Sequence, residues 1–444
     1  MLVDFSVENF LSFKDRQTLS FEPDVKVKGL EDYYLISVRD KDSQKKQLQL
    51  LKIGMIYGAN ASGKSNLLKA LDHMRSIALR TQTEKNIQLK FIPFGMDNSG
   101  KSAMEVNFIS EQTKYNYKVE FNTNMIVYEE LNEYPFLTAR KSKNVYKRTT
   151  DKEKRLPNIV FDKGQKVDSM TQRQLSIVTL SNETVLAGFS KISADIPALR
   201  NSCDWFSYKI DKLLPPQTPL HMIAAYYIDN NLIKSQSMVS ALKRADFNIS
   251  DISIDKKGSA KEYMQDVLES YVEGHKLTIN LEGEYFDNNS KIPKIIIRHK
   301  TDQTEFVLPD SLESEGTMRY FELMGILLHL SDSDGQFMMI DELGMALHPE
   351  LYDSFIISFL KNVKNSQLLF TTHNREFLQK KQILRKDALW IANKRSDGST
   401  EMYSFADFNS SVIRDTTSIY NAYSIGKLGG VPRNSDDLML YIEK

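Results

Sequence analysis

The chain has 444 residues, long enough for two or more domains, and its 41% hydrophobic and 26% charged residues are ordinary for a globular protein. Lys plus Arg and Asp plus Glu both total 58, so the net charge of zero gives no overall argument for a nucleic-acid or membrane partner. The single cysteine, Cys203, excludes an intrachain disulfide and a zinc ribbon, and it suits a reducing compartment. No apolar stretch approaches the length of a membrane span, and the first residues lack the pattern of a signal peptide, so we expect a cytoplasmic protein without membrane contact.

The first 94 residues predict half of a nucleotide-binding core. Residues 2–13 alternate apolar and polar side chains and are followed by Leu19 and Phe21, which predicts a β-hairpin that leads into the core. Residues 53–57 form an apolar run typical of a buried strand. The next eight residues, 58–65, read G-x-x-x-x-G-K-S, and residues 66–74 place apolar side chains at helical spacing. Strand, loop and helix in this order suit phosphate binding, because the loop N–H groups and the helix N-terminus face the anion.

This phosphate loop predicts a site for the triphosphate of ATP. Lys64 would reach the β- and γ-phosphates, and the Ser65 hydroxyl would bind Mg²⁺. The alternative is a chance turn rich in Gly and Ser, but the three fixed positions and the flanking elements argue against it. The predicted ATP-binding residues are Gly58, Asn60, Ala61, Ser62, Gly63, Lys64 and Ser65.

The middle of the chain predicts two further parts. Residues 95–160 alternate in a way that predicts an antiparallel β subdomain, and residues 161–300 predict a mostly helical insertion with one β-hairpin. The best candidates for helices are 168–186 and 232–247, and those for strands are 276–284 and 291–299.

Residues 140–155 form a basic segment, with eight Lys or Arg against two acids. Such a segment indicates either a contact with nucleic acid or a partner protein, or a solvated hairpin. Few aromatic residues interleave with the charges, which favours the solvated hairpin.

A second set of motifs completes the nucleotide-binding pattern. Four apolar residues, 337–340, precede Asp341 and Glu342, which is the Walker B form: a buried strand delivers an aspartate to Mg²⁺ and places a glutamate to polarise the attacking water. Residues 367–372 form another short apolar strand that leads to His373. With a helix between the strands, Glu342 and His373 should lie at the same edge of one parallel sheet, where His373 could hydrogen-bond the γ-phosphate.

The C-terminal part, residues 301–444, holds one further candidate site. Ser314, Glu315 and Gly316 precede an apolar helix expected at 318–330. The pattern fits an ordinary helix N-cap, and it also fits a second helix N-terminus that binds an anion.

Taken together, these motifs resemble the ABC-type ATPase group that includes the SMC, RecF and OLD proteins. The phosphate loop, the S-E-G-T before a helix, the Walker B acids and T-T-H follow one another in that group's order, and a long insertion separates Lys64 from Asp341. Within the group, the chain is most similar to the AAA-15/AAA-21 type, which resembles the ATPase subunits of bacterial abortive-infection and anti-phage systems such as AbiL, RloA and PARIS. The V-x-N-F-L-S-F start and residues 384–432 add to a resemblance that covers under half of the chain.

The resemblance implies an α/β fold: a P-loop NTPase with an ABC-type ATPase head, built of a parallel sheet core and an antiparallel β subdomain, plus a mixed β and helical insertion. It implies that a homodimer or higher homo-oligomer sandwiches ATP and Mg²⁺, with the signature residues Ser314, Glu315 and Gly316 acting in trans. It also implies a slow regulatory ATPase of anti-phage defence that responds to a phage protein and controls a nuclease effector. The catalytic residues would be Glu342 and His373, and the metal ligands Ser65 and Asp341.

The sequence departs from the group's pattern at two places and leaves other functions open. Glu315 stands inside a reduced signature, His348 replaces the acid that follows Ala-Leu in SMC-like chains, and Gln88 is the candidate for the Q-loop glutamine. A RecF/SMC-like DNA-binding repair ATPase is one alternative, although no sustained heptad pattern predicts a long coiled coil. A nucleotide-dependent scaffold without hydrolysis is another, and the intact Walker B acids and histidine argue against it.

Overall fold

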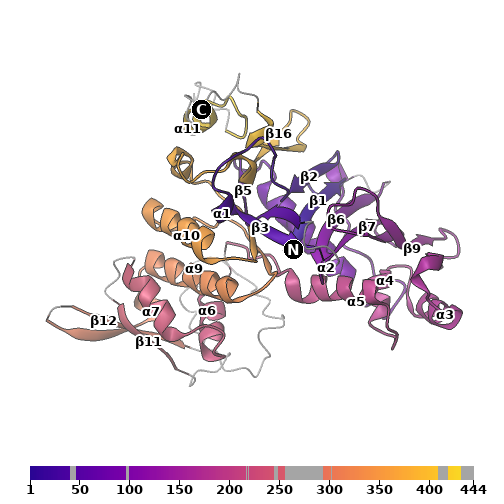
Figure 1. Cartoon of the computed structure of the whole chain (residues 1–444), viewed down its shortest axis with the longest axis horizontal. Coiled ribbons are helices and arrows are strands. Elements are labelled where there is room, and N and C mark those ends of the chain that lie inside the picture. The colour runs from indigo at the N-terminus through magenta and orange to yellow at the C-terminus, as the bar shows by residue number, and fades with distance from the viewer. Residues whose placement is uncertain are drawn as a thin grey trace, which may run out of the picture. The chain divides into compact units, whose positions relative to one another are not determined.

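The structure, a computed structural model, describes residues 1–40, 47–96, 100–216, 218, 220–244, 249–255, 294–301, 303–408 and 419–431. The chain divides into two compact units, and Figure 1 labels many of their helices and strands. The first consists of Met1–Pro216, Asp334–Leu343 and Lys364–Lys444, and the second of Gln217–Ser333 and Gly344–Val363. The strand predicted at 276–284, residues 291–293 of the strand predicted at 291–299, and residues 409–418 and 432 of the 384–432 stretch lie outside the described residues.

The first unit contains a five-stranded sheet that carries the phosphate loop. Its strand order is β14-β15-β5-β16-β17; the first four strands are parallel and β17 is antiparallel to β16. β5, β14 and β15 are buried at every position, as expected for parallel strands covered on both faces. The strands are β5 (Ile53–Tyr57), β14 (Phe337–Ile340), β15 (Gln367–Thr371), β16 (Leu389–Lys394) and β17 (Thr400–Ser404).

This strand order brings three distant segments to one sheet edge. β14, β15 and β5 are neighbours and parallel, so their carboxyl ends lie together. The phosphate loop follows β5, the two acids follow β14, and His373 lies two residues after the end of β15. The prediction that Glu342 and His373 share one edge of a parallel sheet is therefore confirmed. Helix α2 (Lys64–Leu79) continues the phosphate loop and buries its apolar residues, as its spacing predicted.

A seven-stranded antiparallel sheet forms the other part of the first unit. Its order is β10-β9-β8-β7-β6-β1-β2. The hairpin predicted near the N-terminus is the β1–β2 pair, and the alternation at 104–108 and 115–121 belongs to β6 and β7. The rings of Trp205 and Phe206 lie 4.3 and 5.8 Å from the Phe108 ring and cover one face of the sheet. The strands are β1 (Leu2–Glu8), β2 (Gln17–Ser20), β6 (Ser102–Ser110), β7 (Thr113–Phe121), β8 (Ile126–Glu133), β9 (Lys143–Thr150) and β10 (Pro157–Phe161).

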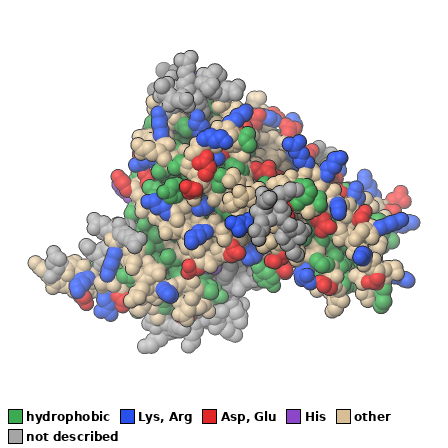
Figure 2. Space-filling model, in the orientation of Figure 1, with side chains coloured by type: hydrophobic (Ala, Val, Ile, Leu, Met, Phe, Trp, Pro, Cys, Tyr) green, Lys and Arg blue, Asp and Glu red, His purple; other side chains and the backbone are tan. Residues whose placement is uncertain are grey.

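The basic segment 140–155 covers β9 and the turn into β10. Arg148 is fully buried and pairs with the equally buried Glu129, with 3.5 Å between nitrogen and oxygen. The other Lys and Arg side chains of the segment are exposed, and Figure 2 shows blue side chains at the end of the unit where Figure 1 places β9 and α3. The segment is thus a solvated hairpin, as the sequence favoured, except at Arg148, which is a core residue.

The single helix predicted at 168–186 is wrong, because the chain breaks there into α3 (Ser169–Val178) and α4 (Val185–Phe189). The Thr184 side chain accepts the Ala187 N–H and starts the second helix. The Asn182 side-chain amide donates to the carbonyls of Glu84 and Ile87, at 3.0 and 2.8 Å, and these tertiary bonds hold the intervening turn.

Short elements complete the first unit. They are α1 (Glu31–Tyr34), β3 (Leu35–Arg39), β4 (Gln47–Leu51), α5 (Pro197–Asp204), α11 (Ile419–Ser424), a π-helical turn η3 (Trp205–Lys209), and 3₁₀ turns η1 (Phe94–Met96), η2 (Lys163–Gln165), η5 (Glu376–Gln379), η6 (Lys386–Ala388) and η7 (Phe405–Asp407).

The second unit packs helices around α9. Gly325 in α9 allows close approach to α6, since a Cβ atom at Gly325 would lie 2.6 Å from the Ala224 Cβ. The helix predicted at 232–247 is described from Ser235 to Arg244. The elements are α6 (Leu220–Asp229), α7 (Ser235–Arg244), β11 (Ile249–Asp255), β12 (Lys294–Lys300), β13 (Glu305–Pro309), η4 (Asp310–Leu312), α9 (Glu315–Asp332) and α10 (Pro349–Asn362). Over the described parts of both units, every helix is too short or too polar to cross a membrane.

Candidate active site

The phosphate loop has a conformation that requires glycine at its end. Gly63 is the N-cap of α2 and adopts φ 101° and ψ 8°, in the left-handed region that disfavours side chains. A Cβ atom at Gly63 would lie 2.0 Å from the Thr400 Oγ1, so space excludes a side chain as well. At the start of the loop, a Cβ atom on Gly58 would lie 2.4 Å from the Ala392 carbonyl oxygen. The two fixed glycines of the motif are thus explained by close packing against β16 and β17.

Residues from both ends of the chain hold the loop in place. The Thr400 hydroxyl donates to the Ser62 carbonyl at 2.8 Å and lies 2.7 Å from the Ser12 Oγ. The Thr400 N–H donates to the Ser12 carbonyl at 2.7 Å, and the Asn66 side chain donates to the Ser12 Oγ at 2.9 Å. Ser12 belongs to the V-x-N-F-L-S-F start, whereas no sequence signal indicated Thr400. Thr400 begins β17 and reaches the loop because β17 pairs with β16 and β16 pairs with β5.

Lys64 is a buried cation inside the loop. Its Nζ donates to the carbonyls of Gly58 and Ala59, both at 2.9 Å. Burial lowers the pKa of Lys64 from 10.5 to about 8, and the negative charges of Glu342 and Asp341 partly oppose this shift. Among the described residues, no carboxylate lies within ion-pair distance of the Lys64 Nζ. A bound polyanion would supply the charge that this ammonium group lacks.

The two acids that follow β14 meet the phosphate loop and the next strand. The Ser65 hydroxyl donates to the Asp341 Oδ1 at 2.9 Å, so the structure brings together the two predicted metal ligands. Asp341 is buried, while the Glu342 side chain is 38% exposed and can contact a ligand or water. Glu342 adopts φ 53°, a left-handed conformation that is rare for a residue with a side chain.

His373 lies beside Glu342. Its Nε2 is 3.8 Å from the Glu342 Oε1, and its side chain is 42% exposed. Desolvation lowers the pKa of His373, and the positive charge of Lys64 lowers it further, while Glu342 opposes the shift. The imidazole is therefore neutral at neutral pH and retains one N–H that can donate to an anion.

The side chains at this edge fit magnesium held together with a nucleotide. The Ser65 O–H points at Asp341, so the oxygen lone pairs of the hydroxyl can still bind a cation, and hydroxyl and carboxylate oxygens are ligands that Mg²⁺ prefers. In the described parts of the chain, no group of three or more His, Cys, Asp or Glu side chains could hold a metal alone. A magnesium ion here would take its remaining ligands from phosphates and water, as it does in most nucleotide sites.

Comparison with known proteins identifies the family. Residues 54–378, which span the phosphate loop, both acids and His373, match the family described as "AAA domain, putative AbiEii toxin, Type IV TA system". The chain belongs to this family. It is thus an AAA-type ATPase-family protein with a P-loop core. A comparison with curated proteins found no match.

Two solved structures of SMC heads are similar to this AAA-domain protein. The SMC head domain from Thermotoga maritima is 13% identical, with 91% of this chain and 98% of that chain covered and a TM-score of 0.37. A crystal structure of the SmcHead bound to the C-winged helix domain of ScpA is 12% identical, with 91% and 97% covered and a TM-score of 0.42.

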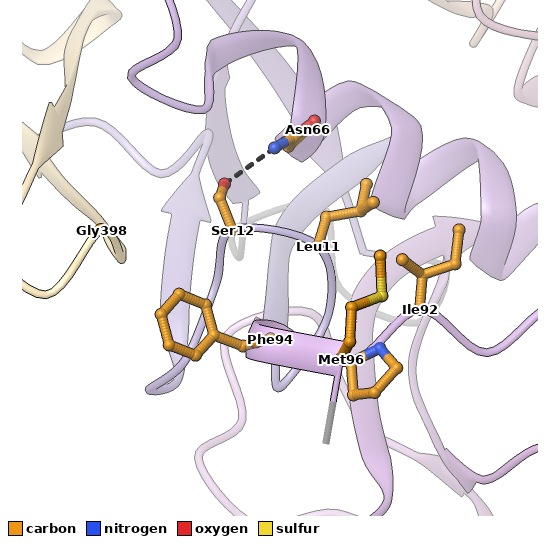
Figure 3. A pocket seen from close by; sticks show the side chains of 9 residues that line it. Leu11, Ser12, Asn66, Ile92, Phe94, Met96 and Gly398 are labelled. Carbon is orange, nitrogen blue, oxygen red and sulfur yellow. Dashed lines mark hydrogen bonds between the residues drawn. The ribbon is translucent and has the colours of Figure 1, made fainter. Parts of the chain in front are cut away.

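A cavity of about 340 Å³ opens beside the first turn of α2 in the AAA-domain core (Figure 3). Asn66, which directly follows the metal-binding candidate Ser65, lines it, and its hydrogen bond to Ser12 forms one polar side. Leu11, Ile92 and Met96 provide apolar side chains close to one another in Figure 3. The cavity is open to solvent, and its lining is mainly apolar. Its lining residues are Leu11, Ser12, Asn66, Ile92, Pro93, Phe94, Gly95, Met96 and Gly398.

The signature residues lie in the second unit and form a helix N-cap. The Ser314 side chain accepts the Thr317 N–H at 3.1 Å and caps α9. Glu315 is exposed, and a Cβ atom on Gly316 would lie 3.4 Å from the Ala346 carbonyl oxygen. The ordinary cap is therefore present, and an additional role toward a second copy stays a prediction.

Proposed function

We propose that this chain binds ATP with Mg²⁺ at the edge formed by β5, β14 and β15 and hydrolyses it slowly as a regulatory ATPase. The observation that supports this most directly is the convergence of three segments: Ser65 donates to Asp341 across 276 positions, and Glu342 lies 3.8 Å from His373. A buried lysine, a hydroxyl and two acids around a glycine loop are the groups that phosphoryl transfer requires.

Each side chain has a separate part in the proposed hydrolysis of ATP. Lys64 neutralises the β- and γ-phosphates from inside the loop, and Ser65 and Asp341 would hold Mg²⁺, which supplies charge neutralisation of the phosphates when bound. Glu342, at the exposed edge, accepts a hydrogen bond from the attacking water and orients it. Neutral His373 donates its N–H to the γ-phosphate, where negative charge is concentrated.

The cavity next to Asn66 accepts the nucleoside of the bound ATP. Asn66 lines this cavity and directly follows the loop residue Ser65, so the cavity lies next to the proposed phosphate site. The mainly apolar lining suits the faces of a purine ring, and the Asn66 amide and Ser12 hydroxyl can hydrogen-bond its polar edge.

The biological role that we infer is regulation of an anti-phage defence system. The family description refers to an AbiEii toxin and a toxin–antitoxin system, and the sequence resembles abortive-infection ATPases. In this proposal, the cytoplasmic protein forms an ATP-sandwich homodimer or higher homo-oligomer, in which Ser314, Glu315 and Gly316 of one copy contact the ATP of another. A phage protein triggers it, and a separate nuclease is the effector.

A RecF/SMC-like DNA-binding repair ATPase is the second candidate. It is favoured by the exposed Lys and Arg side chains on the β9–β10 hairpin, which include Lys152, Lys154 and Arg155 without ion pairs to the described residues. Binding to duplex DNA through these cations would weaken steeply with salt, because each phosphate contact releases counterions. Binding of a fluorescent duplex measured between low and physiological salt separates the two candidates.

The ATPase proposal is tested by two substitutions. Lys64→Ala should abolish binding of fluorescent ATP, because the buried charge that faces the phosphates is lost. Glu342→Gln should retain binding but stop turnover, and it should trap an ATP-bound oligomer visible by light scattering. Lys69→Ala, on the exposed face of α2, is the matched control. Unchanged hydrolysis in both site variants would refute the proposed function.

A further inference from the structure

A buried threonine connects the two acids of the site. Thr371 is the last residue of β15 and is 0% exposed. Its hydroxyl donates to the Asp341 Oδ1 at 2.5 Å and accepts the main-chain N–H of Glu342 at 2.8 Å. We propose that the Thr371 hydroxyl is a positioning group for ATP hydrolysis, which sets the orientation of both acids; this inference rests on the ATPase function proposed above.

The parallel pairing of β14 with β15 explains why the hydroxyl reaches both acids. Ile340 pairs with Phe370, so the residues that follow, Asp341 and Thr371, lie side by side where β14 ends. On the opposite side, the Asp341 N–H donates to the Leu214 carbonyl at 2.9 Å. The main chain of the aspartate is thus fixed from one side and its carboxylate from the other.

The hydroxyl has a defined effect on the Asp341 carboxylate. Oδ1 accepts two hydrogen bonds, one from Ser65 and one from Thr371, which fixes the rotation of the carboxyl plane. A Mg²⁺ ion bound by both side chains would compete with the Ser65–Asp341 hydrogen bond, whereas Thr371 is part of the buried strand β15. Outer hydrogen bonds of this kind hold metal ligands in their binding orientation.

The same hydroxyl stabilises the unusual backbone of Glu342. A left-handed conformation at φ 53° is unfavourable for a glutamate unless its surroundings hold it. The Glu342 N–H donates to the Thr371 hydroxyl, and the next N–H, of Leu343, donates to the Thr371 carbonyl at 3.1 Å. These two bonds tie the turn after β14 to the end of β15. They direct the Glu342 side chain toward the exposed edge, where it lies 3.8 Å from His373.

Thr371 could instead serve only as a β-branched residue that fills a buried strand, since such residues pack well in sheets. Two substitutions separate this role from that of the hydroxyl. Thr371→Val keeps the branched shape and removes the hydroxyl, leaving the Glu342 N–H without its acceptor. Thr371→Ser keeps the hydroxyl and removes the methyl group. A packing role predicts that Ser is the worse replacement, and a positioning role predicts that Val is.

The experiment compares both variants and the unmodified full chain in kcat for ATP, in the Kd of a fluorescent ATP analogue, and in the Mg²⁺ concentration that half-saturates hydrolysis. For Thr371→Val we expect kcat to fall about 10- to 100-fold, with more Mg²⁺ required, while Kd changes by less than about threefold. For Thr371→Ser we expect kcat within about threefold of the unmodified chain. Thermal unfolding confirms that the variants fold.

A matched control is Thr150→Val. Thr150 is also a buried threonine of a strand, and its hydroxyl donates to the Ile126 carbonyl in the seven-stranded sheet. Its substitution should leave kcat unchanged.

Full activity of Thr371→Val, or an equal loss of kcat in Thr371→Ser, would overturn the positioning role while leaving the ATPase function intact. Absence of hydrolysis by the unmodified chain would overturn the proposed function and this inference with it. If Thr371→Val does not fold, Thr371→Ala takes its place. An active Thr371→Ser together with a folded but inactive Thr371→Ala would support the inference. Equal kcat values for Thr371→Ser and Thr371→Ala would overturn it.

Discussion

ATP binding should take up a proton, and the buried Lys64 is the reason. Burial lowers the pKa of Lys64 from 10.5 to about 8 in the structure, so a large share of the free protein carries a neutral amine at mildly alkaline pH. Binding to the triphosphate requires the ammonium form, and the phosphate charges restore the pKa toward its ordinary value. When ligand binding raises the pKa of a group, the protein takes up a proton together with the ligand. The affinity for ATP must therefore fall as the pH rises through the pKa that Lys64 has in the free protein.

The size of the effect follows from the same pKa. With a pKa of about 8 in the free protein and of about 10.5 in the complex, about 0.5 proton is taken up per ATP at pH 8 and about 0.9 at pH 9. Between pH 7.5 and 9.5, the affinity for ATP should then fall about 20-fold. Phosphate protons, with a second pKa of about 6, do not interfere in this range. The pKa of His373 is lowered from 6.5, so the imidazole does not titrate there either.

Titration calorimetry in buffers of different ionisation enthalpy measures this proton uptake directly. Lys69→Met, on the exposed face of the same helix, should behave as the unmodified chain does, whereas Lys64→Met should lose ATP binding. An ATP affinity that stays constant from pH 7.5 to 9.5, with no proton uptake, would show that Lys64 is already charged before the nucleotide binds and would refute this reasoning.

Two further predictions concern the loop and its surroundings. Gly63→Ala should destabilise the fold by more than about 2 kcal/mol and abolish ATP binding, because its Cβ would meet the Thr400 Oγ1. The control Gly29→Ala, at φ 92° with nothing within 4 Å, should cost only the backbone strain of about 1 kcal/mol in chemical denaturation. Arg375, whose guanidinium lies 5.8 Å from the Tyr423 ring and whose charge lowers the pKa of His373, should contact the γ-phosphate. Arg375→Ala should therefore weaken ATP binding about tenfold and ADP binding little, and equal losses for both nucleotides would contradict this.

The phosphate loop, the Walker B acids and the histidine strand were predictable from the sequence because each is defined by local spacing. Glycines at fixed positions between an apolar strand and an amphipathic helix predicted the phosphate loop, and the structure contains that loop. The strand–helix–strand pattern after Asp341 also predicted that the parallel strands end at the same edge of the sheet. Local spacing gave a wrong prediction at residues 168–186, because the helical periodicity of the sequence continues through a turn that separates two helices. That turn is held by the Asn182 side chain, which bonds to carbonyls almost a hundred positions away.

The sequence by itself determined the kind of chemistry, since a glycine loop with a lysine, two consecutive acids and a histidine has few other uses. Only the tertiary structure decided how those groups are held. Thr371 and Thr400 carry no motif, because a threonine in a buried strand looks like any β-branched residue. Their roles arise from strand order. β15 lies between β14 and β5, which places the Thr371 hydroxyl on the acids. On the other side of β5, β16 pairs with β17, which places the Thr400 hydroxyl on the loop. Strand order depends on contacts between distant segments, and no local pattern encodes it.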